Sequence, residues 1–141
     1  NEGQLKQDQF AASMIVGGQI KGGKPTIFLI YPQGNFIEIS TDTPFFQTGE
    51  TKYGKPILVR AYDPEMSFAD ALKLLLVSFD STVKSNLSVG LPFDFQVYEA
   101  DSFETGICRR IDHGDPVYEA ISQGWGDALK DAFQHLPTYQ L

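Results

Sequence analysis

The stretch TIFLIYPQGNFIEIS, Thr26–Ser40, contains two apolar runs separated by turn-forming residues. Thr26–Tyr31 and Phe36–Ser40 have the β-branched and aromatic composition that is typical of strands. Pro32-Gln33-Gly34-Asn35 lies between them, and this order of residues is typical of a tight turn, because Pro fixes φ and Gly accepts positive φ. The stretch therefore predicts a β-hairpin, whose two strands pair antiparallel.

The residues on either side of this hairpin predict two further strands. FAASMIVGGQI, Phe10–Ile20, is apolar with paired glycines, which predicts a buried strand whose glycines allow close approach of another backbone. Pro44–Thr48 predicts a short additional strand.

The hydrophobic period changes to that of helices after residue 50. Pro56 suits the first turn of a short helix that reaches about Tyr62. Ser67, with Asp70 three residues later, predicts the N-cap of a longer helix, Phe68–Lys84. Six apolar residues lie on one face of that helix, namely Phe68, Leu72, Leu75, Leu76, Phe79 and Val83.

The remaining residues predict a second hairpin and a last helix. Phe93, Phe95 and Val97 alternate with polar residues, which predicts a half-buried strand, and Ile107–Ile111 is the expected partner strand. Asp115-Pro116 predicts the start of a helix that runs toward Leu136. Because hairpins dominate and helices come in separate blocks, the predicted class is α+β with antiparallel sheets.

Composition excludes several classes of protein. The 141 residues fit a single domain, and 42% of them are hydrophobic, so a substantial core is expected. A formal net charge of −7 argues against a nucleic-acid partner, which requires a positive field. No apolar run is long enough to cross a membrane and no signal peptide is visible, while a single cysteine, Cys108, fits a reducing compartment; a cytoplasmic protein is expected.

The motifs that could bind a metal or a cofactor are incomplete. Gly18–Pro25 approaches the phosphate-binding pattern G-x-x-x-x-G-K-[ST], but Pro25 replaces the hydroxyl residue and a strand follows instead of a helix. His113 and His135 are the only histidines and do not lie at zinc-binding spacing from Cys108. We therefore expect no metal and no cofactor.

The polar loop Ser85–Gly90, SNLSVG, follows the long helix and has two interpretations. In the first it only ends the helix and turns the chain, with Asn86 or Gly90 at positive φ. In the second it presents hydroxyl groups and backbone amides to a reaction. The residue types alone favour the turn, because serines are common in loops.

Four segments in this order resemble one protein family. They are FAASMIVGGQI, IFLIYPQGNFIEI, TGETKYGKPIL and ALKLLLVSFDSTVKSNLSVGLPFDFQVYE. They look like the C-terminal portion of a single proteasome-type domain, residues 1–141, with the closest resemblance to the bacterial ancestral-beta-subunit (Anbu) group. The resemblance implies an αββα four-layer sandwich of two antiparallel sheets between helical layers, with the amino-terminal strands missing.

The same resemblance implies a peptidase with an N-terminal nucleophile, usually Thr, whose own α-amine acts as the base. Asn1 has no nucleophilic side chain, so the nucleophile is expected from a missing amino-terminal segment, and this chain alone is expected to be inactive. The family implies a homo-oligomer, a ring or an open ring, that acts on peptides in the cytoplasm without a cofactor. Two alternatives stay open: a non-catalytic structural or assembly subunit, and a small-amide hydrolase of the same superfamily.

The resemblance also implies which residues support the nucleophile. Ser88 matches a serine that hydrogen-bonds the nucleophile's amino group, and Ser85 stands where the family has an acidic residue. Gly49 matches the start of a turn that also contacts the amine, and Glu50 after it is expected to supply the acidic group that Ser85 lacks. The expected supporting residues are Ser85, Asn86, Ser88, Gly90, Gly49 and Glu50.

Overall fold

The computed structural model describes residues 12–140, which form two compact units. One unit contains the residues up to Gly49 together with Val97–Ile107, and the other contains Glu50–Gln96 and the residues from Cys108 onward. With helices and two antiparallel sheets, the predicted α+β class is confirmed.

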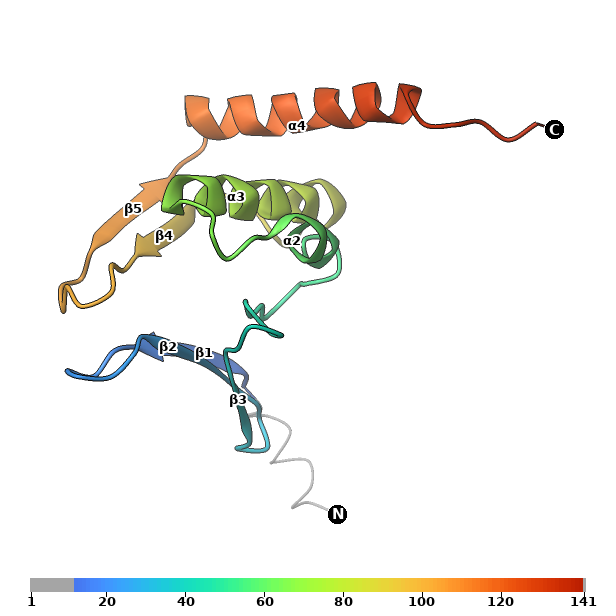
Figure 1. The fold of residues 1–141 in the computed structure, drawn as a ribbon. Helices are drawn as coiled ribbons and strands as arrows, with labels where there is room; N and C mark the ends of the chain where they lie inside the picture. Colours follow the sequence, from blue (N-terminus) through green and yellow to red (C-terminus); the bar gives the residue numbers. More distant parts are fainter. Residues whose placement is uncertain (1–11, 141) are drawn as a thin grey trace, which may run out of the picture. The chain divides into compact units, whose positions relative to one another are not determined.

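The first unit is built on a three-stranded antiparallel sheet of order β1-β2-β3 (Figure 1). The strands are β1 (Met14–Gly18), β2 (Thr26–Ile30) and β3 (Phe36–Glu38). Gly34 takes a φ of 86° in the turn between β2 and β3, and its N–H donates to the carbonyl of Tyr31 at 2.9 Å. The predicted hairpin is therefore confirmed, together with the glycine that its turn requires.

Two expectations for this unit are wrong. The strand β1 is not buried, because all five of its residues are exposed, with Met14 at 53% and Val16 at 47%; Phe10 lies outside the described residues. Pro44–Thr48 forms no strand. Pro44 has no N–H to give to a ladder, and Ser40 and Thr43 close a tight turn just before it through two backbone hydrogen bonds of 3.1 Å.

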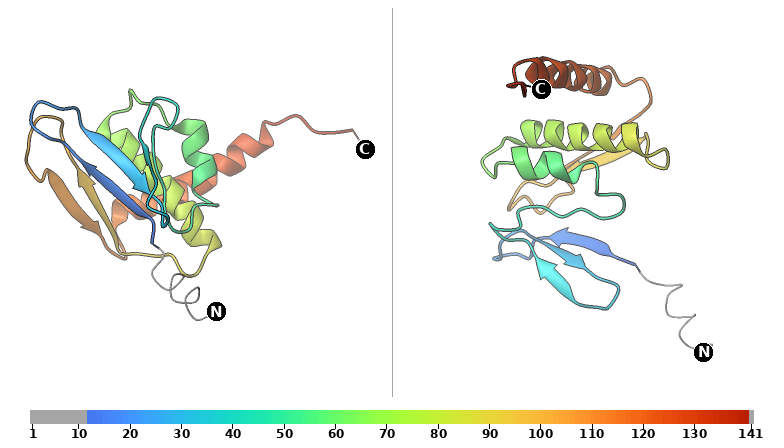
Figure 2. Two further views of the ribbon diagram at one scale, coloured as in Figure 1. Left: turned by 90° about the horizontal axis from the view of Figure 1, so that it is seen from below. Right: turned by 90° about the vertical axis from the view of Figure 1, so that its right-hand side faces the viewer.

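The second unit contains three helices that lie side by side (Figures 1 and 2). They are α2 (Lys55–Ala61), α3 (Phe68–Ser85) and α4 (Pro116–Gln134). The Ser67 hydroxyl accepts the N–H of Asp70 at 3.1 Å at the start of α3. At the start of α4, Asp115 accepts the N–H of Val117 at 3.0 Å and that of Tyr118 at 2.8 Å. Both predicted N-caps are confirmed.

The core of this unit lies where α3 and α4 meet the hairpin of β4 (Phe93–Val97) and β5 (Ile107–Ile111). Its buried residues are Leu76, Phe93, Ile111 and Tyr118. The rings of Phe93 and Tyr118 meet edge to face with centroids 5.5 Å apart, which is a favourable aromatic geometry. The predicted alternation in β4 is confirmed, since Phe93 is buried while Asp94 is exposed.

A buried carboxylate, Asp80 on α3, borders this core. Asp80 is only 5% exposed; it accepts the Tyr118 hydroxyl at 3.3 Å, and the ammonium group of Lys84 lies 4.0 Å away. Burial, followed by the charge of Asp80 and this hydrogen bond, raises the pKa of Tyr118 to about 12. The folded state therefore favours the neutral phenol.

This raised pKa predicts a loss of stability in alkali. The unfolded tyrosine ionises near pH 10 and the folded one near pH 12, so the contribution of Tyr118 is fully present below pH 10 and is lost as the pH rises toward 12. We expect Tyr118→Phe to be less stable than the wild type at pH 9, and the gap in urea midpoint to narrow by pH 11. A difference in urea midpoint that stays constant from pH 9 to pH 11 would contradict the raised pKa of Tyr118.

Candidate functional site

The geometry of the candidate site depends on close packing of the start of α2 against α3. Gly54, the N-cap of α2, is buried against Ser78 and Thr82, which are themselves buried on α3. A Cβ on Gly54 would overlap the Ser78 hydroxyl and would come within 3.0 Å of the Ser78 carbonyl oxygen and 3.2 Å of the Thr82 hydroxyl. The absence of a side chain is therefore what lets the start of α2 reach α3.

This close approach places the turn before α2 beside the end of α3. Asn86 is the C-cap of α3, and its N–H donates to the carbonyl of Thr82 at 2.8 Å. Glu50 lies four residues before Gly54, and its carboxylate accepts the Asn86 amide NH₂ at 3.1 Å. The carboxylate also accepts the N–H of Lys52 at 3.2 Å, which holds Glu50 within its own turn.

Asn86 joins Glu50 to Ser88. The amide oxygen of Asn86 accepts the Ser88 N–H at 2.9 Å and the Ser88 hydroxyl at 2.7 Å. The Ser88 hydroxyl donates its one proton to Asn86. The Ser88 oxygen can therefore only accept hydrogen bonds from any other group. We call this connected set of Glu50, Asn86 and Ser88 the relay.

Of the six expected supporting residues, the structure brings Glu50, Asn86 and Ser88 into direct contact. Ser85 is exposed and lines another cleft, between α3 and α4, together with Asp80 and Lys84. Gly90 is exposed with open space around its Cα, and Gly49 takes a φ of 79° directly before Glu50.

The turn interpretation of Ser85–Gly90 is confirmed in part, because Asn86 is the C-cap of α3 and the N–H of Val89 closes a turn on the carbonyl of Asn86 at 3.2 Å. The expected positive φ at Asn86 or Gly90 is wrong. Asn86 has an extended backbone with φ −140° and ψ 113°, and Gly90 is not among the glycines with positive φ. The turn thus starts from an extended Asn86, whose side chain also holds Ser88. No signal in the sequence singles out Gly54, since a glycine before Lys55-Pro56 fits an ordinary helix start.

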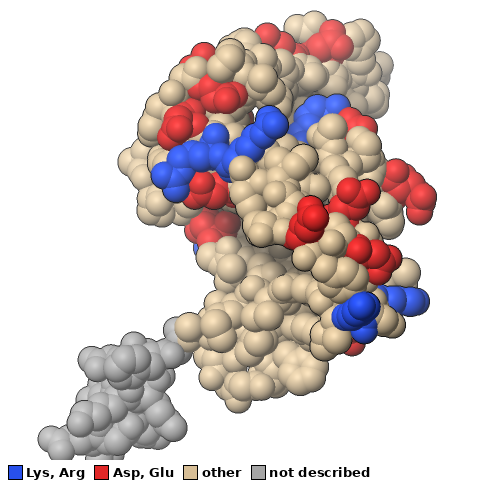
Figure 3. Space-filling view, turned by 90° about the vertical axis from the view of Figure 1, so that its left-hand side faces the viewer, with Lys and Arg blue, Asp and Glu red and all other residues tan. Residues whose placement is uncertain are grey.

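On the face shown in Figure 3, basic side chains lie among acidic ones. Within residues 12–140, no group of three or more His, Cys, Asp or Glu side chains is placed to hold a metal ion. None of the described helices is long and apolar enough to cross a membrane.

The contact at Gly54 predicts a matched pair of stability changes. Gly54→Ala should destabilise the protein by about 1–3 kcal/mol, because the new methyl group meets the α3 backbone as well as a side chain. Gly124→Ala, in α4 with open space around it, should be neutral or stabilising by up to about 1 kcal/mol. Urea unfolding of both variants measures this, and equal effects would refute the steric argument.

Comparison with known proteins places the chain among proteasome-like structures. The family described as "Proteasome subunit" matches residues 4–95. The solved structure of Anbu (ancestral beta-subunit) from Yersinia bercovieri is 45% identical with a TM-score of 0.90, and the match covers 99% of this chain and 60% of that chain. No curated protein gives a significant match.

Two other solved structures agree with this match. An Anbu (Gly-1) mutant from Hyphomicrobium sp. strain MC1 is 48% identical with a TM-score of 0.91, covering 99% of this chain and 61% of its own. The helical assembly of the Anbu complex from Pseudomonas aeruginosa is 48% identical with a TM-score of 0.86, covering 91% of this chain and 53% of its own. The chain thus spans about 60% of the length of the first two structures it matches.

Proposed function

The chain belongs to the proteasome subunit family, and on that premise we propose that residues 1–141 form the C-terminal portion of one proteasome-type domain in a peptidase with an N-terminal nucleophile. The nucleophile, by resemblance a threonine, is supplied by residues outside these 141. This chain supplies the scaffold and the polar wall that holds the nucleophile's amino group. The substrate is a peptide, and the reaction uses no metal or cofactor.

The observation that carries this proposal is the relay. In the proposed reaction the α-amine takes the proton of the attacking hydroxyl, so an ammonium group forms next to the loop Ser85–Gly90. Ser88 offers lone pairs to that ammonium, because its own proton is donated to Asn86. The loop from Ser85 to Gly90 carries this acceptor.

Glu50 supplies the negative charge that the family pattern places three residues before Ser88. A serine can orient an ammonium but cannot offset its charge, so Ser85 does not replace a carboxylate. Glu50 is tied to Ser88 through the Asn86 amide at 3.1 and 2.7 Å. Its charge stabilises the protonated amine and so raises the proton affinity of the base.

We also propose that the protein assembles with copies of itself into a ring or an open ring in the cytoplasm. The relative from Pseudomonas aeruginosa, which is described as a helical assembly, supports self-association. A ring or an open spiral would follow from one repeated contact between neighbouring copies, depending on whether the rotation closes.

Substitutions in the relay test the peptidase function in the whole protein. We expect Ser88→Ala to lower kcat/KM for peptide hydrolysis about 10- to 100-fold, the loss of one hydrogen bond to a charged group, while assembly is unchanged. Leu87→Ala, a fully exposed residue of the same loop, is the control and should retain wild-type activity. Equal activity of Ser88→Ala and the wild type would remove Ser88 from the site.

Glu50→Gln should also slow hydrolysis, with a signature that a merely structural role would not produce. Removing the negative charge disfavours the ammonium, so the acid limb of the pH profile of kcat/KM should move to lower pH. A slower enzyme with an unmoved acid limb would assign Glu50 a structural role.

Turnover of small amides in place of peptides would favour the amidohydrolase alternative, and an assembled wild type that hydrolyses neither would favour a structural subunit.

A further inference from the structure

The side chain of Gln19 joins two segments of the first unit that lie far apart in the chain. Its amide oxygen accepts the hydroxyl of Tyr98 and the N–H of Asp101, both at 2.8 Å. Its NH₂ group donates to the Asp101 carboxylate at 2.7 Å and to the carbonyl of Gly23 at 2.8 Å. A primary amide has two donors and two acceptor positions, so Gln19 uses its full hydrogen-bonding capacity here. We call these four hydrogen bonds the latch.

The latch holds a loop whose backbone is strained. This loop, Tyr98–Gly106, connects β4 to β5 and belongs with β1 and β2 in the first unit. Asp101 has a φ of 64° and Phe103 a φ of 54°, which cost free energy in any residue but glycine and most in a bulky one. Gly106 has a φ of 72°, and a Cβ there would overlap the carbonyl oxygen of Val97. Surrounding contacts must therefore hold the loop in this conformation, and the latch supplies four of them.

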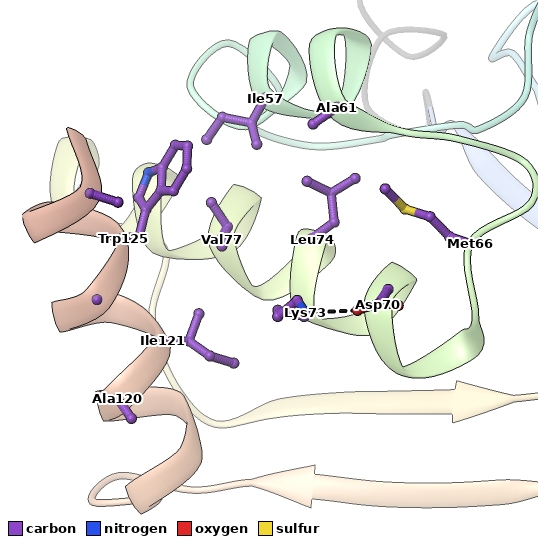
Figure 4. Close-up of a pocket in the computed structure, with 12 residues that line it drawn as sticks. Ile57, Ala61, Met66, Asp70, Lys73, Leu74, Val77, Ala120, Ile121 and Trp125 are labelled. Carbon is purple, nitrogen blue, oxygen red and sulfur yellow. Dashed lines mark hydrogen bonds and ion pairs between the residues drawn. The ribbon is translucent and has the colours of Figure 1, made fainter. Parts of the chain in front are cut away.

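The hairpin that carries this loop is fixed at its other end. Phe93 and Ile111, at the ends of the paired strands β4 and β5 away from the loop, are buried in the core of the second unit. Ile121 of α4, which Figure 4 shows pointing toward α3, packs against the same core. The helix α3 contributes to this core and ends at Asn86, a member of the relay. One continuous hairpin therefore runs from the core that holds α3 to the loop that Gln19 holds.

We propose that the latch makes Gln19 a positioning residue for the peptidase reaction, an inference that rests on the function proposed above. In that reaction the nucleophile comes from residues before Asn1, and the chain continues from them into β1. Gln19 directly follows Gly18, the last residue of β1. The latch thus ties the strand that the nucleophile's segment enters to the hairpin that is fixed in the same core as α3. Without the latch, the nucleophile's amine is held less closely against Ser88.

Hydrogen exchange tests the latch itself, independently of any activity. The N–H of Asp101 donates to Gln19, so its exchange rate in the whole protein reports whether the latch is closed. Gln19→Leu removes the hydrogen bonds and keeps a side chain of similar size, and it should speed the exchange of this amide about tenfold or more. Gln33→Leu, in the exposed turn between β2 and β3, is the control and should exchange as the wild type does. Equal exchange in Gln19→Leu and the wild type would refute the latch.

An exchange of donor and acceptor separates the effect of the hydrogen bonds from that of side-chain shape. Gln19→Glu has nearly the same shape, but its carboxylate cannot donate to Gly23 and repels the Asp101 carboxylate. We expect it to open the latch as Gln19→Leu does. Adding Asp101→Asn to Gln19→Glu supplies an NH₂ donor opposite the new carboxylate, and asparagine also accepts positive φ, so slow exchange should return. Continued fast exchange in the double variant would refute the assigned hydrogen bonds.

The pH profile and a double-mutant cycle test the positioning role. Gln19→Leu should lower kcat/KM for peptides about tenfold, because the amine is misplaced. It should also move the acid limb to lower pH, in the same direction as Glu50→Gln, because the ammonium is stabilised less. In the Ser88→Ala background, Gln19→Leu should have almost no further effect, since the contact that it weakens is already lost. Gln33→Leu should keep the wild-type activity and pH profile.

The outcomes separate this inference from the proposal on which it rests. A wild type that hydrolyses no peptide refutes the proposed function and the positioning role with it, while hydrogen exchange still decides whether the latch exists. A Gln19→Leu variant that exchanges fast but keeps the wild-type kcat/KM refutes the positioning role alone. Losses in Gln19→Leu and Ser88→Ala that simply multiply in the double variant refute an action through Ser88.

Discussion

The contact of Gly54 with Ser78 and Thr82 is the constraint on which the site depends. It is a contact between a backbone without a side chain and the buried polar face of α3. Because Asn86 follows Thr82 by one helical turn and Glu50 precedes Gly54 by four residues, this one approach sets the position of both. The carboxylate thus reaches the end of α3 from a segment 36 residues away in the chain.

Local signals in the sequence were sufficient for most of the elements. Caps such as Ser67 and Asp115, and the turn glycine Gly34, act within a few residues, so their chemistry can be read from the sequence and each is confirmed. Burial is a different property, because it depends on what packs against an element. The strand β1 has the composition of a buried strand and is exposed on both faces within the described residues.

The sequence predicted which residues form the candidate site but not the hydrogen bonds among them. The resemblance to proteasome-type subunits pointed to Ser88 and Glu50, but residue types alone do not tell which polar groups meet. Asn86 was expected to permit a turn through a positive φ. It starts the turn with an extended backbone, and its side chain links Glu50 to Ser88. The role of Gly54 cannot be read from the sequence, because it depends on how closely α3 packs against the glycine in the folded protein.

Glu50 has a second effect besides its charge, because it favours one orientation of the Asn86 amide. The carboxylate can accept only from the NH₂ group, so the amide oxygen turns toward Ser88 and accepts a hydrogen bond from its hydroxyl. If the amide were reversed, its NH₂ group would donate to Ser88, and the Ser88 proton would point outward against an approaching ammonium. The Ser88 N–H, which donates to the same amide oxygen at 2.9 Å, favours the same orientation. The carboxylate of Glu50 and the backbone of the loop together therefore make Ser88 present an acceptor.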